Sequence, residues 1–199
     1  MPTLEFWYEY ASTYSYLSVM RIEEAARVAR VALRWRPFLL GPIFNAQGWD
    51  TSPFNLFPEK GAYMWRDMDR LCQARGLPFR PPSPFPQNGL YAARLTLLGA
   101  EEGWAPRFSR AVFTAQFAHG LQLANKQALG NSLEALGLDS KALLARIDEP
   151  DVKSALKAQT EQAQGLGIFG APSFVTEDGE LFWGDDRLEQ ALLWAKGEG

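Results

Sequence analysis

Hydrophobic and polar positions along the first forty residues predict a strand, a helix and a second strand. The run Leu4–Glu9 is aromatic and apolar, as in a buried strand, and the polar pair Ser12-Thr13 follows it. A helical pattern then continues to about Arg30. The apolar face of this helix comprises Leu17, Met20, Ala25 and Val28. Residues Ala32–Phe38 alternate and predict a second strand, which the crossover helix makes parallel to the first.

The middle of the chain is predicted to be mainly helical. Residues 39–57 are rich in Gly, Pro and Asn, which predicts loop or short irregular turns, and the prolines of 76–87 exclude a regular helix there. Helical patterns occupy 58–75, 88–101, 105–118, 125–136, 139–147 and 150–165. Asp139 fits the cap of one of these helices, and Pro150 fits the first turn of the next.

The C-terminal segment returns to strands and a helix. Ser173–Thr176 and Leu181–Trp183 are predicted strands, joined through the hairpin signal Asp178-Gly179. A helix follows from Asp186, with an apolar stripe at helical spacing. The order β-α-β, helical insert, β-β-α predicts an α/β thioredoxin-like fold with an inserted all-helical domain. We expect 1–40 plus 165–199 to form the thioredoxin-like domain and 41–164 the helical insertion.

Composition and charge narrow the class of protein. The net charge of −3 comes without a basic stripe, so we do not expect a nucleic-acid partner. No apolar run is long enough for a transmembrane helix, and the N-terminus lacks secretory signal features, so a cytoplasmic location is the expectation. Cys72 is the only cysteine and His119 the only histidine. An internal disulfide is therefore excluded, and a typical zinc site is not expected.

Ser12 is the first candidate for chemistry, because it lies between the first predicted strand and its helix. Ser commonly caps a helix. A hydroxyl at this position can also donate to an anion held against the helix end. Together these interactions can lower the pKa of a bound thiol enough to keep it largely ionised near neutral pH. Ser12 is therefore either a cap or a thiolate ligand, and the two roles are compatible.

Two C-terminal segments are candidates for holding a peptide-like ligand. Pro172 precedes an apolar strand; in a thioredoxin-like layout this proline is cis, and the backbone of Ala171 then pairs with a bound peptide. An ordinary trans proline that opens the strand is the alternative. Asp185 and Asp186 precede the last helix, either as first-turn caps or as ligands of an α-ammonium group. Trp183, just before this pair, is either a core residue or an edge of the same cleft.

The chain resembles the 2-hydroxychromene-2-carboxylate isomerase and kappa-class glutathione transferase family, a branch of the DsbA-like thioredoxin folds. The resemblance lies in the order and joint occurrence of several segments spread over nearly the whole chain. These segments are FWYEYASTYSYLS (6–18), PEKGAYMWRDMDRLCQARGLPF (58–79), FPQN (85–88), DEPDVKSALKAQTEQAQGLGIFGAPSFV (148–175) and ELFWGDDRL (180–188).

The resemblance implies glutathione as cofactor, a homodimer and a role for each matching residue. Ser12 matches the serine that holds the glutathione sulfur, and Asn55 an asparagine of the glutathione or substrate groove. Ala171, before Pro172, matches the residue that pairs with the cysteinyl unit. The aspartates at the γ-glutamyl end are Asp185 and Asp186.

The chain departs from the family pattern where the substrate would bind. Asn45 stands where the family often has lysine, and Phe85 where the naphthalene-pathway isomerases carry a tyrosine. A cation and a hydroxyl donor are therefore absent, although Asn45 and Phe85 remain the residues expected to line the substrate site. Three functions follow in order of preference. The first is a glutathione-dependent isomerase or transferase acting on a small aromatic or electrophilic substrate, the second a non-catalytic glutathione-binding module, and the third a DsbA-like oxidoreductase.

Overall fold

A four-stranded mixed sheet in the order β2-β1-β3-β4 organises the protein, and the computed structural model describes all 199 residues. The strands are β1 (Thr3–Tyr8), β2 (Ala32–Pro37), β3 (Ser173–Thr176) and β4 (Leu181–Trp183). β1 and β2 run parallel, β3 is antiparallel to β1, and β4 is antiparallel to β3. The predicted parallel pair and the predicted C-terminal hairpin are both confirmed.

The helices fall into two groups along the chain. Those next to the strands are α1 (Thr13–Val19), α2 (Ile22–Ala29) and α11 (Leu188–Ala195), with a 3-10 turn η1 (Asp185–Arg187) before α11. Those between β2 and β3 are α3 (Leu40–Ala46), α4 (Pro53–Leu56), α5 (Pro58–Arg75), α6 (Leu90–Glu102), α7 (Ala105–His119), α8 (Lys126–Glu134), α9 (Ser140–Arg146) and α10 (Pro150–Gly165).

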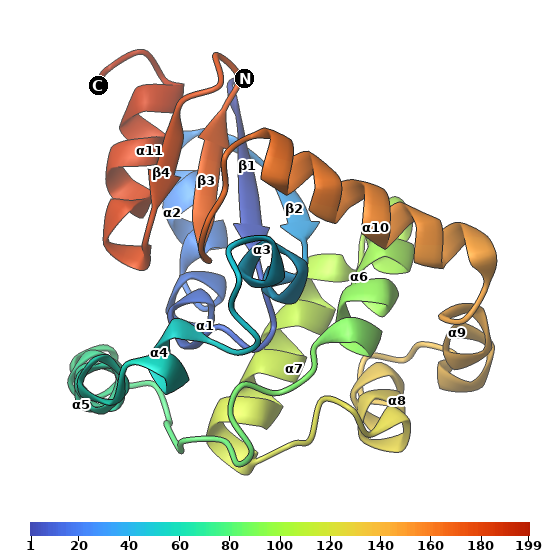
Figure 1. Cartoon of the computed structure of the whole chain (residues 1–199). Coiled ribbons are helices and arrows are strands. Elements are labelled where there is room, and N and C mark those ends of the chain that lie inside the picture. The colour runs from blue at the N-terminus through green and yellow to red at the C-terminus, as the bar shows by residue number, and fades with distance from the viewer.

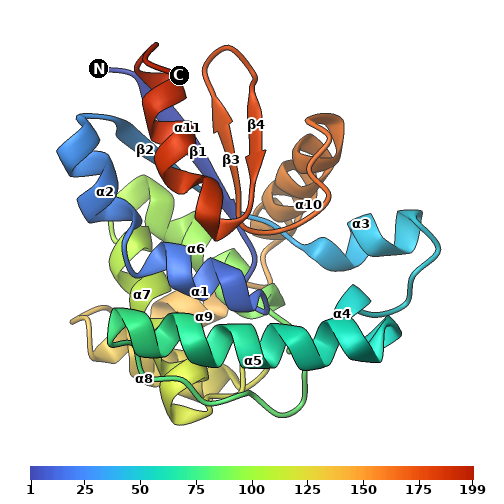
Figure 2. The ribbon, with the colours of Figure 1, turned by 90° about the vertical axis from the view of Figure 1, so that its left-hand side faces the viewer.

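These helices surround the ends and faces of the sheet rather than forming one layer. Figure 1 shows α6 to α9 gathered below the sheet, with α10 returning the chain to β3. In Figure 2, α5 runs across the molecule beside α1, with α3 and α4 at one end of it. No helix is long and apolar enough to cross a membrane. The division into 1–40 plus 165–199 and 41–164 stays a prediction.

Two sequence-based predictions about local structure were wrong. The first helix is interrupted at Arg21, whose guanidinium binds Asp185 and Glu189, so that α2 buries Ile22 and Ala26 and leaves Val28 68% exposed. The segment 39–57 contains α3 and α4 in addition to loops. Tertiary packing explains α3, because the side chain of Ile43 is buried in the core against one face of the sheet.

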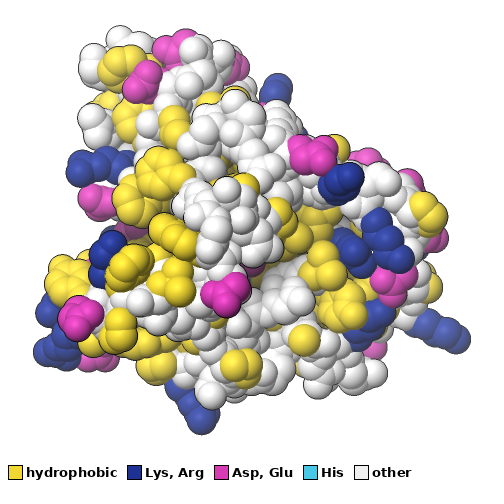
Figure 3. All heavy atoms as spheres, viewed as in Figure 1, with side chains coloured by type: hydrophobic (Ala, Val, Ile, Leu, Met, Phe, Trp, Pro, Cys, Tyr) yellow, Lys and Arg dark blue, Asp and Glu magenta, His cyan; other side chains and the backbone are white.

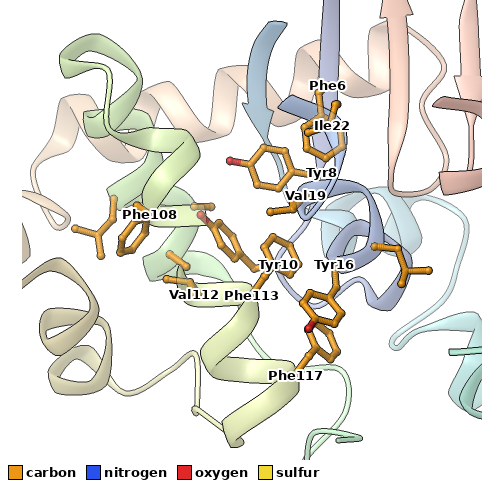
Figure 4. Close-up of a cluster of buried hydrophobic side chains, with 14 of the residues drawn as sticks. Phe6, Tyr8, Tyr10, Tyr16, Val19, Ile22, Phe108, Val112, Phe113 and Phe117 are labelled. Carbon is orange, nitrogen blue, oxygen red and sulfur yellow. The ribbon is translucent and has the colours of Figure 1, made fainter. Parts of the chain in front are cut away.

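Two hydrophobic clusters lie on opposite faces of β1, as the alternation of a strand requires. Phe6 and Tyr8 belong to the larger cluster, which also contains residues of α2, α6, α7 and α11. Trp7 belongs to a smaller cluster with residues of α3 and α10. The larger cluster reaches the helices below the sheet, where the Tyr10 ring stacks on Phe113 with centroids 5.0 Å apart (Figure 4).

Hydrogen bonds also join the C-terminal end of β1 and the residues after it to α6 and α7. The Tyr8 hydroxyl lies 2.7 Å from Ser109 Oγ in α7, and the Tyr10 hydroxyl lies 3.0 Å from the same atom. Tyr10 also contacts Thr96 of α6 at 2.5 Å. These buried polar groups all have partners, as interior hydroxyls require. They hold the segment that follows β1, and with it Ser12, at a defined place.

Candidate functional site

Ser12 caps α1 and reaches across to the proline loop. Its Oγ accepts a hydrogen bond from Ser15 N–H at 3.1 Å and donates one to the carbonyl oxygen of Ala171 at 2.9 Å. The capping role is thus present. The second bond joins two residues that are 159 positions apart in sequence. The structure therefore brings together two of the residues that the sequence predicts for one site.

The Ala171–Pro172 peptide bond is cis, the first of the two alternatives that the sequence left open, and two features make its backbone available. The Ala171 N–H donates no hydrogen bond within the protein, and its carbonyl oxygen is bound only by the Ser12 hydroxyl. The Pro172 carbonyl oxygen, in contrast, accepts the Gly184 N–H at 3.0 Å. This last bond joins the proline loop to the turn that carries the two predicted aspartates.

Asp185 and Asp186 lie in different surroundings. The Asp185 side chain is 5% exposed and accepts three charged or polar donors, whereas the Asp186 side chain is 74% exposed. The donors to Asp185 are Ser18 Oγ at 2.9 Å, Arg21 Nε at 3.1 Å and Arg75 Nη2 at 2.6 Å. Asp185 therefore connects α1, α5 and η1 internally. Asp186 is the carboxylate that remains open to a ligand.

Gly184 is needed at this turn for two reasons. Its φ of +112° lies in a region that side chains rarely adopt. A Cβ there would also lie 2.5 Å from Asp186 Oδ1. The glycine thus lets the Asp186 carboxylate fold back over the backbone, close to the proline loop.

These residues line one large cleft, with a volume of about 1340 Å³. Its walls come from the segments 9–14, 39–55, 85–90, 169–171 and 183–186, together with Lys60, Asp67, Leu71 and Arg75 of α5. Figure 3 shows hydrophobic side chains interspersed with charged ones over the part of the surface where α3 and α4 lie. A cleft with an apolar lining and a few converging polar groups is typical of a small-molecule site.

The predicted substrate residues also line this cleft, on the side formed by α3, α4 and the 83–88 loop. Asn45 is exposed on α3. The Asn55 amide donates to Thr51 Oγ1 at 3.1 Å and to the Phe85 carbonyl at 3.0 Å, which joins α4 to the loop. The Phe85 ring packs on Trp65 with centroids 4.7 Å apart. Asn55 therefore shapes this wall as well as facing the cleft.

An aromatic pair forms the opposite rim. Phe169 and Trp183 are 48% and 53% exposed, and their rings meet edge to face with centroids 4.9 Å apart. A Cβ at Gly170 would lie 2.4 Å from Trp183 Nε1, so the glycine allows the indole to lie against the proline loop. Of the two interpretations of Trp183, the edge of the cleft is the one the structure supports.

The cleft also contains charged residues that were not predicted as site residues, and Glu9, Lys60 and Arg75 are three of them. Lys60 and Arg75 line it from α5, and Glu9 lies at its base, only 7% exposed. Burial raises the pKa of the Glu9 carboxyl to about 8, and the Ala11 N–H that bonds to it opposes this rise only in part. The sequence signal that could have indicated Glu9 is a carboxylate at the end of an apolar strand.

Comparisons with known proteins identify the family of the chain. The model of the DSBA-like thioredoxin domain family matches residues 3–192. The chain is 27% identical over 188 residues to 2-hydroxychromene-2-carboxylate isomerase of Sphingobium xenophagum, which covers 94% of each chain. It is 29% identical over 200 residues to human glutathione S-transferase kappa 1, which covers 94% of this chain and 88% of that protein.

A solved structure supports the fold independently. A 2-hydroxychromene-2-carboxylate isomerase superimposes with a TM-score of 0.86 at 24% identity, over 98% of this chain and 94% of that one. The predicted α/β thioredoxin-like fold is thus confirmed, and so is the resemblance to both kinds of protein. Since the family model matches nearly the whole length, the chain belongs to the DSBA-like thioredoxin domain family.

Proposed function

We propose that this protein is a glutathione-dependent enzyme of the 2-hydroxychromene-2-carboxylate isomerase or kappa-class transferase type. The hydrogen bond between Ser12 and Ala171, which connects the helix cap to the proline loop inside one cleft, is the observation that carries the proposal. The relatives named as an isomerase and a glutathione transferase support it. Cytoplasmic location and homodimerisation remain parts of the proposal.

The charges in the cleft complement those of glutathione, which carries two carboxylates and one ammonium group. Asp186 is exposed and suits the ammonium of the γ-glutamyl unit, while Lys60 and Arg75 offer cations to the carboxylates. Asp185 holds Arg75 in place through the 2.6 Å ion pair. The unpaired N–H and the carbonyl of Ala171, beside Pro172, suit the peptide backbone of the cysteinyl unit. The residues therefore fit the ligand.

Ser12 can change its hydrogen-bond partner when such a peptide binds. A serine hydroxyl has one proton, which here lies on the Ala171 carbonyl oxygen, while the Ser15 N–H fixes the position of Oγ. A ligand N–H that donates to Ala171 satisfies this carbonyl, so the Ser12 proton can turn to a sulfur atom in the cleft. A hydrogen bond to a charged group contributes about 1.5–3 kcal/mol, enough to favour the thiolate over the thiol.

When bound, glutathione supplies a thiolate nucleophile that can add to a conjugated carbonyl compound or displace a leaving group. The protein's contribution is an apolar rim for an aromatic substrate, formed by Phe169 and Trp183 on one side and Phe85 on the other. Asn45 offers an amide, without a charge, where the substrate's polar group would lie. The substrate class we propose is therefore a small aromatic electrophile.

The non-catalytic glutathione-binding module is the second candidate, because Asn45 and Phe85 lack the cation and the hydroxyl of the family pattern. A DsbA-like disulfide exchange is disfavoured by the residues at the start of α1, where the Cys-x-x-Cys positions hold Ser12 and Ser15. Cys72 is 1% exposed, and burial raises the pKa of its thiol to about 11. Neither feature suits a redox cysteine.

Titration of reduced glutathione into the protein, with thiolate absorbance followed against pH, tests the proposal. We expect the pKa of the bound thiol to fall below its free value in the wild type, and Ser12→Ala to abolish this fall. Ser15→Ala is the matched control, since its buried Oγ has no hydrogen-bond partner. No binding of glutathione to the wild type would refute the proposal, and binding with an unshifted thiol would favour the non-catalytic module.

A further inference from the structure

Glu9 is a buried carboxyl group at the base of the cleft that the proposed function does not yet use. It follows β1 and is the third residue before Ser12, whose N–H donates to the Glu9 carbonyl oxygen at 3.0 Å. Glu9 is only 7% exposed, and it is one of the residues that line the cleft. A carboxyl group at such a place is costly to bury as an ion.

The hydrogen bonding of Glu9 distinguishes its two oxygens. Oε2 accepts the Ala11 N–H at 2.9 Å, whereas Oε1 accepts no hydrogen bond from the protein. Gly89 makes room for this second oxygen, since a Cβ there would lie 3.0 Å from Oε1. In a neutral carboxylic acid, one oxygen accepts and the other carries the proton. The arrangement fits an acid whose Oε1–H is free to donate.

No cation is hydrogen-bonded to Glu9 or forms an ion pair with it. Tyr10 follows it in the chain, but its hydroxyl is bound to Thr96 and Ser109 and, like that of Tyr8, is buried. The charged groups that line the same cleft are Asp50, Lys60, Asp67, Arg75, Asp185 and Asp186. Arg75 is paired with Asp185, and the Lys60 ammonium lies 4.7 Å from the centroid of the Phe57 ring and forms no ion pair with Glu9, so no cation contacts this carboxyl group. Burial accordingly raises the pKa of its carboxyl to about 8.

We propose that Glu9 is the proton donor of the cleft, a neutral carboxylic acid that protonates the carbonyl oxygen of a conjugated carbonyl substrate. The inference deepens the proposed function and rests on it. As a thiolate adds to the substrate, a C–S bond forms, the electron pair of the C=C bond shifts to form the double bond of an enolate, and the π pair of the C=O bond moves to the oxygen. This oxygen takes the proton of Glu9, which becomes a carboxylate. When the C–S bond breaks, the carboxylate takes the proton back, the C=O and C=C bonds form again, and the C–S pair leaves with the sulfur as a thiolate.

A neutral Glu9 also suits a neighbouring thiolate. An ionised carboxylate close to Ser12 would repel the bound thiolate and oppose its formation. The protonated acid adds no charge at that place, and it can donate a hydrogen bond to negative charge that develops nearby. One residue would thus serve both the nucleophile and the substrate oxygen, provided that the pH stays below the pKa of Glu9.

The test compares the wild type with Glu9→Gln, whose amide keeps the size and the Ala11 contact but cannot give up a proton. Glu5→Gln is the matched control, because Glu5 lies on β1 outside the cleft and pairs with Arg36. The first measurement is the infrared carbonyl band of a protonated carboxylic acid in the ligand-free protein. We expect a band that disappears near pH 8 in the wild type and Glu5→Gln, and that Glu9→Gln lacks.

The second measurement separates proton donation from thiolate formation. Benzylideneacetone is a conjugated carbonyl probe, whereas displacement of chloride from chlorodinitrobenzene needs no carbonyl protonation. With glutathione, Glu9→Gln should lower turnover of the first probe by about 10²–10⁴-fold and remove its decline above pH 8, while the second changes little. Glutathione binding and the thiolate absorbance should stay as in the wild type.

The outcomes distinguish the two proposals. If Glu9 is ionised at neutral pH, or if both probes are affected equally, the donor role is overturned while glutathione binding still supports the proposed function. If the wild type does not bind glutathione, the proposed function fails and the donor role fails with it.

Discussion

Three carboxylates of the cleft take different roles through their surroundings. Glu9 is buried without a counter-charge, Asp185 is buried between two arginines, and Asp186 is exposed. Burial alone favours the neutral acid, whereas arginine partners compensate the charge and exposure leaves a carboxylate free to bind. The residue type alone therefore does not indicate what each carboxylate does in the cleft. Each of the three leads to a separate prediction.

Glu9 should make the stability of the protein depend on pH. Because the pKa of its carboxyl is raised from 4.5 to about 8 in the folded state, the folded protein binds a proton that the unfolded chain has released. The free energy of unfolding should therefore decrease as the pH rises from about 4.5 to about 8, by up to ~1.4 kcal/mol per pH unit. Denaturant unfolding of the wild type and Glu9→Gln measures this, and parallel pH curves would contradict it.

The two aspartates should separate stability from binding. Asp185→Asn removes the charge between Arg21 and Arg75, which are themselves partly exposed, so we expect a loss of about 2–4 kcal/mol in the free energy of unfolding. Asp186→Asn should change that free energy by no more than ~0.5 kcal/mol. It should instead weaken glutathione binding about tenfold or more. Unfolding curves and calorimetric titration measure the two effects, and equal losses of stability would count against this division.

At the scale of elements, the short segments around the cleft depend on each other. The proline loop is joined to α1 through Ser12 and to η1 through Gly184. η1 is joined in turn to α1 and α5 through Asp185. A substitution in one of these turns should therefore change the affinity for the ligand, even where the turn and the helices next to it remain folded.

Gly184→Ala tests this dependence, with Gly179→Ala as the matched control. Both glycines have positive φ, so an alanine should cost about 1–2 kcal/mol of stability at Gly179 (φ +88°). At Gly184, where φ is +112° and ψ is 148°, the cost should be about 1–3 kcal/mol. Only at Gly184 would the new Cβ meet Asp186, 2.5 Å from its Oδ1, whereas nothing lies within 4 Å at Gly179. Calorimetry should show weaker glutathione binding for Gly184→Ala alone. A similar loss in the control would mean that general destabilisation is the cause.

The same elements show what the sequence could predict. Periodicity was sufficient for β1, β2, the C-terminal hairpin and the long helices, and Asp139 and Pro150 begin α9 and α10 as expected. It failed at Arg21, the residue before α2, whose guanidinium pairs with Asp185 of a segment far away in sequence. It failed also for α3, which depends on packing against the sheet.

For the candidate site, the residues could be predicted but not all of their contacts. Ser12 and Ala171 do lie together, yet the burial of Asp185 between Arg21 and Arg75 depends on contacts between residues more than a hundred positions apart. Glu9 was missed for a similar reason. Its environment is created by Gly89 and the start of α6, which no local pattern around Glu9 indicates.

At the scale of the whole molecule, one continuous core joins the sheet to the helices inserted between β2 and β3. The larger cluster contains residues of β1 and β3 together with residues of α6 and α7. The aromatic series Tyr8, Tyr10, Phe113 and Phe117 crosses the boundary between the two proposed domains (Figure 4). Such a shared core couples the stability of the two parts.

We therefore expect the sheet and the helical segment to unfold as one cooperative unit. Phe113→Ala, in α7, removes a buried ring that stacks on Tyr10 and should lower the free energy of unfolding by about 3–5 kcal/mol. β1 and α7 should lose the same amount of stability, because their side chains belong to the same cluster. Val28→Ala is the control, since this side chain is 68% exposed and should change the free energy by no more than ~0.5 kcal/mol.

Hydrogen exchange under increasing denaturant measures this coupling at individual segments. If the core is shared, the slowest amides of β1 and of α7 should open with the same free energy in the wild type, and both should lose protection equally in Phe113→Ala. If the mutation affects α7 while β1 keeps its protection, the helical segment is an independently folding domain. The cleft between the two parts would then open and close by domain motion, whereas a single cooperative unit holds Ser12, Ala171 and Glu9 in a preformed arrangement.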